Sequence, residues 1–312
     1  MNIVFFGTAE FAIPAFRELL ASKHKVVALV TQPDRKRGRN LKLSPPPTKV
    51  LAQAHNIPVY QPEDASSPGA IEYLGKLGAD LFVVIAFGQI LRQEALGIPK
   101  SCAINLHGSL LPRYRGAAPT NWAIINGDKT TGVTIIRMNE KMDEGDIVLR
   151  REVSVDPEDT NITINESLSG LGAKALMEAI ALIESGKAQF EKQDKTQVTL
   201  ARKLRKEDGA INWAEPATVI HSRVRGLLPW PGAYTSYAGK TLKILSTELV
   251  AYSPSSQVTV GEVLDIVKGK GIIVNTGSGA IAIKFLQLEG GKVLDIDSFL
   301  RGHKLNIGDT LI

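Results

Sequence analysis

The chain has 312 residues, of which 44 % are hydrophobic and 22 % charged, with a formal net charge of +5. This length exceeds what one hydrophobic core usually serves, so we expect two domains. The single cysteine, Cys102, excludes an internal disulfide and a cysteine-rich zinc site, and no metal is expected. No stretch of about 18 uncharged apolar residues exists, and the first residues lack a signal-peptide pattern. We therefore expect a cytoplasmic protein with no membrane partner.

The N-terminal half alternates short apolar segments with amphipathic ones, which is typical of a parallel sheet with crossover helices. Strands are expected over 2–6, 25–31, 59–60, 80–87 and 103–107, and helices over 11–21, 48–55, 70–77 and 118–126. A single glycine, Gly7, marks the first turn. Because the G-x-G-x-x-G fingerprint is absent, a nicotinamide cofactor is not expected.

An acidic turn at 143–145 lies between predicted strands over 132–138 and 147–155. A long helix over 162–185 follows, and we expect Gly170 and Gly172 to interrupt it. After a polar, basic segment the pattern changes to strand candidates separated by turns, with one helix over 216–227. The strand candidates are 210–213, 233–237, 243–249, 259–267, 271–276 and 280–288. Such spacing predicts a small barrel or sandwich.

These patterns predict an α/β N-terminal domain over 1–189, a basic linker over 190–208 and a smaller β domain over 209–312. Residues 1–189 are nearly neutral, with 21 Lys and Arg against 20 Asp and Glu, whereas residues 190–312 hold 16 against 12. The basic surplus of the second part fits a polyanionic partner, or simply solubility.

A predicted long loop over 32–47 is also basic. It contains five cations and no acid after Asp34; the cations are Arg35, Lys36, Arg37, Arg39 and Lys42. Like charges on one loop repel one another unless an anion binds among them. The loop is therefore either a solvated surface segment or a contact for nucleic acid or phosphate.

Two polar residues end the predicted strand over 103–107. Asn105 and His107 are two positions apart, so a strand places both on one face. An amide and an imidazole can together stabilise an oxygen that gains charge in acyl transfer, and Asp143 is the best-placed carboxylate to orient the imidazole. Neither Cys102 nor Ser109 has the pattern of a nucleophile, which favours direct transfer. Structural roles, such as a cap, a strand-end histidine and a turn aspartate, remain open for each residue, and the residues alone do not separate a transferase from a hydrolase.

The segment Asn105-Leu106-His107-Gly108-Ser109-Leu110-Leu111-Pro112-Arg113-Tyr114-Arg115-Gly116, with Asp143-Glu144-Gly145-Asp146 downstream, resembles the signature of formyltransferases that use 10-formyltetrahydrofolate. The resemblance extends along the whole chain, from Phe6-Gly7-Thr8 to Pro229-Trp230-Pro231. It implies a Rossmann-like N-terminal domain and a C-terminal β-barrel of the oligonucleotide-binding (OB) type. It also implies that Asn105, His107 and Asp143 are catalytic. The folate-binding residues it implies are Phe87, Gly88, Ser109, Leu110, Leu111 and Pro112.

The loop from Thr31 to Arg39 resembles the insertion with which tRNA-dependent members of this family hold the acceptor end, and the key arginine matches Arg39. The resemblance thus implies 10-formyltetrahydrofolate as formyl donor and an initiator methionyl-tRNA as acceptor, bound by a monomer. The expected tRNA contacts are Arg35, Lys36, Arg37, Arg39, Lys42, Arg202, Lys203, Arg205 and Lys206. Two alternatives remain: a formyltransferase acting on an amino-sugar nucleotide, and a tRNA-binding relative without activity.

Overall fold

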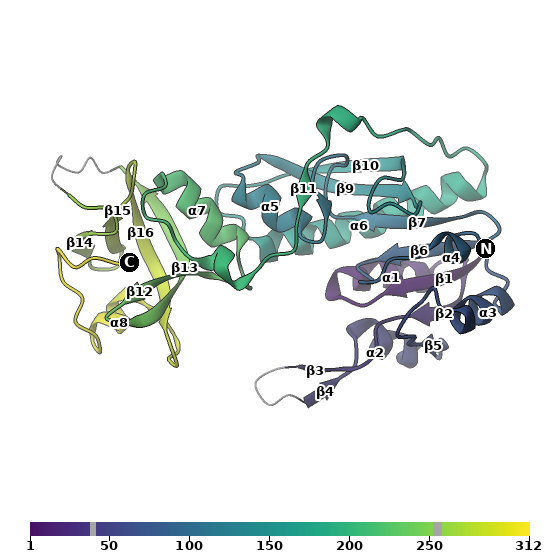
Figure 1. Ribbon diagram of the computed structural model, residues 1–312, viewed down its shortest axis with the longest axis horizontal. Helices are drawn as coiled ribbons and strands as arrows, with labels where there is room; N and C mark the ends of the chain where they lie inside the picture. Colours follow the sequence, from purple (N-terminus) through teal and green to yellow (C-terminus); the bar gives the residue numbers. More distant parts are fainter. Residues whose placement is uncertain (38–41, 252–257) are drawn as a thin grey trace. The chain divides into compact units, whose positions relative to one another are not determined.

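The structure is a computed structural model that describes residues 1–37, 42–251 and 258–312 (Figure 1). The chain divides into two compact units. The first comprises Met1–Pro119, Thr130–Ser154 and Asn165–Arg202, and the second Thr120–Lys129, Val155–Ile164 and Lys203–Ile312. Within the described residues, no helix is both long and apolar enough to cross a membrane.

The first unit contains a seven-stranded sheet in the order β10-β9-β7-β6-β1-β2-β5. Its strands are β1 (Asn2–Gly7), β2 (Lys25–Val30), β5 (Val59–Tyr60), β6 (Leu81–Ile85), β7 (Cys102–His107), β9 (Thr130–Arg137) and β10 (Asp146–Ser154). The five strands from β7 to β5 pair in parallel, whereas β9 and β10 are antiparallel to their neighbours. The order reverses at β1, the kind of position where open α/β sheets bind ligands.

Both faces of this sheet are buried, as expected for strands connected by crossover helices. On one face of β1, Phe5 stacks on Phe16 of α1 with ring centroids 4.4 Å apart. On the other, Phe6 packs against Phe82 and Phe87. The helical elements that accompany the sheet are η1 (Glu10–Ala12), α1 (Ile13–Ala21), α2 (Pro47–Ala54), α3 (Pro68–Lys76), α4 (Gln93–Leu96), α6 (Asn161–Glu184) and η2 (Lys195–Gln197). The predicted α/β, Rossmann-like architecture is confirmed.

Helix α6 runs without a break through Gly170 and Gly172, so the predicted interruption is wrong. The reason is packing, because a Cβ on Gly172 would come within 2.7 Å of Leu106 of β7. The glycine lets the helix approach the strand that carries Asn105 and His107. Its cost in helix propensity is therefore offset by close contact with the sheet.

The region predicted as a loop over 32–47 contains a two-stranded ribbon, so that prediction is corrected. Strand β3 (Arg35–Arg37) pairs antiparallel with β4 (Lys42–Ser44), which satisfies backbone groups that a loop would leave to water. The base of the ribbon is fixed by Asp34, whose carboxylate accepts hydrogen bonds of 2.8 Å from Lys49 and Gln61. These bonds hold the pKa of Asp34 below its usual value.

The second unit contains a six-stranded antiparallel sheet in the order β12-β13-β16-β15-β14, with β17 beside β16. Its strands are β12 (Ala233–Tyr237), β13 (Lys240–Val250), β14 (Val263–Val267), β15 (Gly271–Asn275), β16 (Ala280–Leu288) and β17 (Val293–Asp295). Residues 309–312 join the two edge strands. Ile312 exchanges backbone hydrogen bonds with Ser236 of β12. The backbone N–H of Val263 in β14 donates to the carbonyl of Asp309. The C-terminal residues thus bridge β12 and β14, the two ends of this strand order, and the antiparallel β domain that was predicted is confirmed.

The helical elements of the second unit are α5 (Pro119–Ile125, beginning at the last residue of the first unit's segment), η3 (Lys206–Gly209), α7 (Ala217–Gly226) and α8 (Ile296–Leu300). The strand predicted over 210–213 is absent, and only Ala210 forms a bridge, to Tyr234. Strand β17 and helices α4 and α8 were not predicted, because each is only three to five residues long and has no clear periodicity.

Candidate active site

The site is built at the end of β7, where Asn105 pairs with Val84 of β6 and His107 with Thr134 of β9. Alternation along the strand places Asn105 and His107 on one face, as predicted. His107 is buried and Asn105 half-buried. Across the described residues, no protein group forms a hydrogen bond with the Asn105 side chain. Its amide is therefore able to donate to a ligand.

Both ring nitrogens of His107 face protein acceptors. Nε2 lies 2.9 Å from the carbonyl oxygen of Tyr114, so Nε2 carries a hydrogen and donates it. Nδ1 lies 3.6 Å from Oδ1 of Asp143, which is mostly buried. An imidazolium, with a hydrogen on each nitrogen, suits both acceptors. The sequence predicted that Asn105 and His107 would both face the reacting oxygen. In the structure both ring nitrogens of His107 face protein acceptors, so within the described residues the donor without a protein partner is the Asn105 amide.

Asp143 lies in the turn between β9 and β10, where the hairpin was predicted. Its other oxygen, Oδ2, accepts a 2.8 Å hydrogen bond from the backbone N–H of Gly116. Asp143 has a φ of 54° and Tyr114 a φ of 61°, both in the left-handed region that non-glycine residues rarely adopt. Such a conformation costs about 1–3 kcal/mol and persists only when surrounding contacts impose it. The contacts of this turn therefore determine where the carboxylate points.

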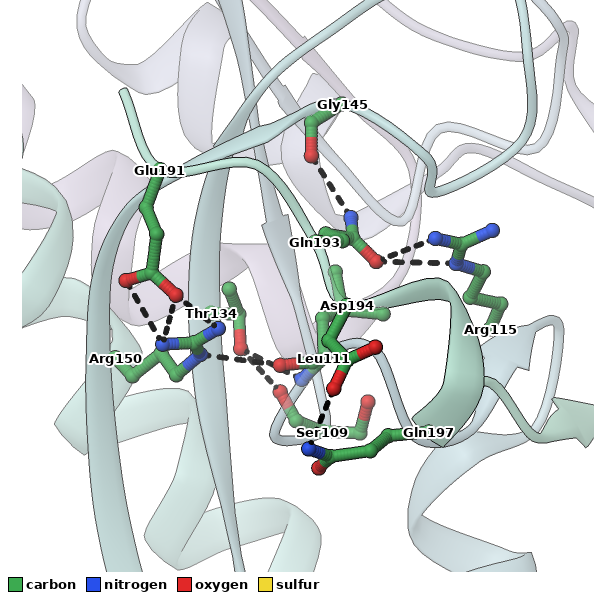
Figure 2. A network of polar contacts seen from close by, with 10 residues as sticks. All are labelled: Ser109, Leu111, Arg115, Thr134, Gly145, Arg150, Glu191, Gln193, Asp194 and Gln197. Carbon is green, nitrogen blue, oxygen red and sulfur yellow. Dashed lines mark hydrogen bonds and ion pairs between the residues drawn. The ribbon is translucent and has the colours of Figure 1, made fainter.

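The loop after His107 is held by Thr134 of β9 and Arg150 of β10, which Figure 2 shows beside Ser109 and Leu111. Thr134 donates to the carbonyl of Ser109 at 2.7 Å and accepts from the N–H of Leu111 at 3.0 Å. Arg150 donates to the carbonyl of Leu111 at 3.0 Å and pairs with Glu191. The backbone of this loop is thus fixed at both of its ends.

The residues expected to bind folate do not all expose side chains. Phe87 packs in the core, Ser109 and Leu111 are fully buried, Pro112 is buried and Leu110 half-buried. The Ser109 hydroxyl donates to the Arg113 carbonyl at 2.7 Å. Gly88 is exposed at the carboxyl end of β6, with a φ of 86°. Folate contacts at these positions remain a prediction. Phe87 and Ser109 are almost fully buried, and their carbonyls already accept hydrogen bonds from Thr8 and Thr134.

The expected tRNA contacts fall into two groups. Arg35 and Lys36 are exposed on β3, while Arg39 and the side chains of Arg37 and Lys42 lie outside the part that the structure describes. The second group is exposed on the segment after the short strand β11 (Leu200–Ala201) and consists of Arg202, Lys203, Arg205 and Lys206. These contacts remain a prediction.

Sequence reasoning missed two buried residues beside the turn, Gln193 and Arg115. The Oε1 atom of Gln193 accepts from Arg115 Nε at 3.0 Å and from Nη2 at 2.8 Å (Figure 2). Gln193 occurs in a polar stretch that lacks any periodic signal, so only the fold shows its burial. Next to the turn, Asp146 is also buried. Burial raises its pKa, but hydrogen bonds from Lys192 and Arg137 outweigh that effect, and the pKa lies below its usual value.

No group of three or more His, Cys, Asp or Glu side chains suited to a metal ion is found among residues 1–37, 42–251 and 258–312. The site therefore consists of one free amide, one imidazole between two acceptors, and one carboxylate held in a strained turn, all on the first unit.

Residues 1–180 match the formyl transferase family, and residues 203–304 match the formyl transferase C-terminal domain. The chain belongs to the formyl transferase family. Over its whole length it is 45 % identical to the methionyl-tRNA formyltransferase of Geobacter sulfurreducens and covers 96 % of that protein. It is 41 % identical over its whole length to the methionyl-tRNA formyltransferase of Moorella thermoacetica and covers 99 % of it. Both matches extend over the whole of this chain and nearly the whole of each relative.

Solved structures share the fold at lower identity. WlaRD, a sugar 3N-formyl transferase crystallised with dTDP and 5-N-formyl-THF, has a TM-score of 0.69 at 17 % identity, covering 94 % of this chain and 99 % of that one. An N-formyltransferase from Helicobacter canadensis, in complex with folinic acid and dTDP-3-aminofucose, has a TM-score of 0.67 at 18 % identity, covering 91 % and 98 %. HypX from Aquifex aeolicus has a TM-score of 0.65 at 18 % identity, covering 98 % of this chain and 49 % of HypX.

Proposed function

We propose that this protein transfers the formyl group of 10-formyltetrahydrofolate to the α-amino group of methionine on initiator methionyl-tRNA. The observation that carries the proposal is the free Asn105 amide beside the His107–Asp143 pair, at the end of a central strand. The full-length identity to methionyl-tRNA formyltransferases supports the same acceptor.

In the proposed reaction the amine nitrogen attacks the formyl carbon and a tetrahedral intermediate forms. Asn105 donates a hydrogen bond to the oxygen that becomes negative, and the His107 imidazolium adds positive charge nearby. Asp143 keeps His107 in place and accepts the proton that the attacking amine loses. The bond from the formyl carbon to N10 of the folate then breaks, and N10 takes up the proton that Asp143 accepted, which restores the carboxylate. No covalent enzyme intermediate is needed.

The folate is proposed to lie against the carboxyl end of β6 and the loop 109–112. Ala86 and Gly88 are exposed there with φ values of 46° and 86°, so the chain presents backbone groups rather than large side chains. Backbone N–H and C=O groups suit a flat heterocycle whose edge carries several donors and acceptors. The residues present therefore fit the donor.

We propose that residues 1–189 carry the transfer chemistry, that 190–208 link the two parts, and that 209–312 bind tRNA. The individual tRNA contacts that we propose are the nine cations named from the sequence, five within 35–42 and four within 202–206, alongside the basic face of 209–312. We also propose a monomeric, cytoplasmic protein. Light scattering at working concentration should give a mass near 33.7 kDa; a mass of twice that value would contradict the monomer.

Alanine substitution of Arg202, Lys203, Arg205 and Lys206 together should raise KM for tRNA and leave KM for the folate donor unchanged. If each cation contacts a phosphate, the slope of log affinity against log salt should fall by roughly three, because each lost contact removes about 0.7–0.9. Tight-binding titrations at several salt concentrations measure this slope. A double variant at the exposed Lys76 and Lys100 removes charge elsewhere and should keep the original slope. An unchanged slope in the fourfold variant would remove this segment from the interface.

The acceptor is tested directly by offering the folate donor together with charged initiator tRNA, glycinamide ribonucleotide or an amino-sugar nucleotide. We expect only the tRNA to become formylated. Formylation of the amino sugar would favour the alternative that the solved sugar formyltransferases suggest. tRNA binding without consumption of the donor would indicate an inactive relative.

A further inference from the structure

The turn that carries Asp143 is held from outside by one buried side chain. Gln193 donates from Nε2 to the carbonyl of Asp143 at 2.7 Å and to the carbonyl of Gly145 at 2.8 Å. Figure 2 shows the amide between Gly145 and Arg115. Both hydrogens of the amide are used on the turn, and its oxygen is used on Arg115. The orientation of Gln193 is therefore fully determined.

Arg115 contacts both Gln193 and the turn. Its guanidinium is buried and its Nη1 lies 3.1 Å from Oε1 of Glu144, the middle residue of the turn. The next residue along the chain, Gly116, donates its N–H to Oδ2 of Asp143. Together Gln193, the Arg115 side chain and the Gly116 backbone contact all three residues of the turn. No other element of the described chain makes hydrogen bonds to both the Asp143 and Gly145 carbonyls.

The segment that carries Gln193 is itself anchored on both sides. Before it, Glu191 exchanges two backbone hydrogen bonds with Ile147 of β10, at 2.8 and 2.9 Å. After it, β11 (Leu200–Ala201) pairs in parallel with β8 (Arg115–Gly116). Gln193 therefore connects an anchored segment to the turn, although it lies within the segment that was expected to be a linker.

We infer that Gln193 is a positioning residue for formyl transfer: it aims the Asp143 carboxylate at His107 and contacts neither substrate. The inference rests on the proposed role of Asp143. A left-handed aspartate needs contacts that impose its conformation, and Gln193 supplies two of them. When they are lost, the turn relaxes and the carboxylate moves away from the imidazole. A displacement of about 1 Å at a reacting group can lower the rate roughly 10²-fold.

The test is Gln193→Met, which keeps the size of the side chain and removes its hydrogen bonds. We expect kcat to fall about 10- to 100-fold, with KM for both substrates within about twofold of the original. Gln197→Met is the matched control: it lies four residues away and is exposed, and within the described residues its side chain bonds only the Asp194 carboxylate, at 2.9 Å. This control should retain full kcat. If kcat were unchanged in Gln193→Met but reduced in Asp143→Asn, the inferred role of Gln193 would be overturned and the proposed role of Asp143 would stand.

A double-mutant cycle separates positioning from a general loss of structure. If Gln193 acts through Asp143, adding Gln193→Met to Asp143→Asn should lower kcat no further. Independent, multiplicative losses would show that Gln193 acts elsewhere and would overturn the inference. Full activity of Asp143→Asn would instead overturn the proposed role of Asp143. If Gln193→Met does not fold, Gln193→Glu replaces it, since the carboxylate still accepts from Arg115 but cannot donate to the two carbonyls; the same cycle then applies.

Discussion

Replacing His107 by alanine is expected to lower kcat by about 10²–10³-fold while the protein still binds tRNA. In the proposed mechanism the imidazole supplies positive charge beside the forming oxyanion, and in the structure it lies between the Tyr114 carbonyl and Asp143. The substitution removes that charge at the reacting atoms and nothing at the proposed tRNA contacts. Single-turnover formylation of charged initiator tRNA measures the chemical step, and filter binding measures affinity for the tRNA.

The alanine variant also leaves two buried acceptors without their partner, which costs about 1–3 kcal/mol of stability. His107→Gln therefore accompanies it: the glutamine amide reaches about as far as Nε2 of the imidazole and can still donate to the Tyr114 carbonyl, but it carries no charge. We expect a similar loss of kcat with a smaller loss of stability. His55→Ala, which removes an exposed imidazole at the end of α2, is the control and should behave as the original protein. Near-normal turnover in both His107 variants would contradict the proposed mechanism.

The part of the site that sequence could predict is the part encoded by local spacing. Two polar residues at i and i+2 on an apolar strand define a shared face, and an acidic Gly-containing segment between two strands defines a turn. Asn105, His107 and Asp143 are each found from such patterns. Strand pairing alone does not bring Asp143 to His107, because β9 is antiparallel to β7 and Arg137, just before the turn, lies opposite Ile104. The contacts of the turn, such as the hydrogen bond from the Gly116 N–H to Asp143, are also needed.

The contacts that hold these residues could not be predicted, because they are long-range. Gln193 is 50 residues from Asp143 and shares no pattern with it. The same holds for α6, where a glycine that weakens an isolated helix is favoured by close packing on β7. The basic ribbon, likewise, depends on backbone pairing rather than on apolar periodicity, the main signal for strands. Contacts between segments far apart in the sequence, which stabilise these elements, are visible only once the fold is known.

Replacing Gly145 by alanine should affect both stability and catalysis, through backbone alone. A Cβ on Gly145 would fall on the carbonyl oxygen of Arg137, which β9 holds in its ladder with Asp146. The turn must therefore move, and it carries both the Asp143 carboxylate and a carbonyl that Gln193 binds. We expect the free energy of unfolding to fall by about 1–3 kcal/mol, Tm to fall by on the order of 5 °C, and kcat to fall about 10²-fold.

Gly75→Ala is the matched control, because Gly75 lies inside helix α3 with no atom within 4 Å of its added Cβ. Alanine there should stabilise the protein slightly, by about 0.5–1 kcal/mol, and leave kcat unchanged. If Gly145→Ala lowered Tm but not kcat, the position of the turn would be irrelevant to the reaction, and Asp143 would have to act without a fixed geometry.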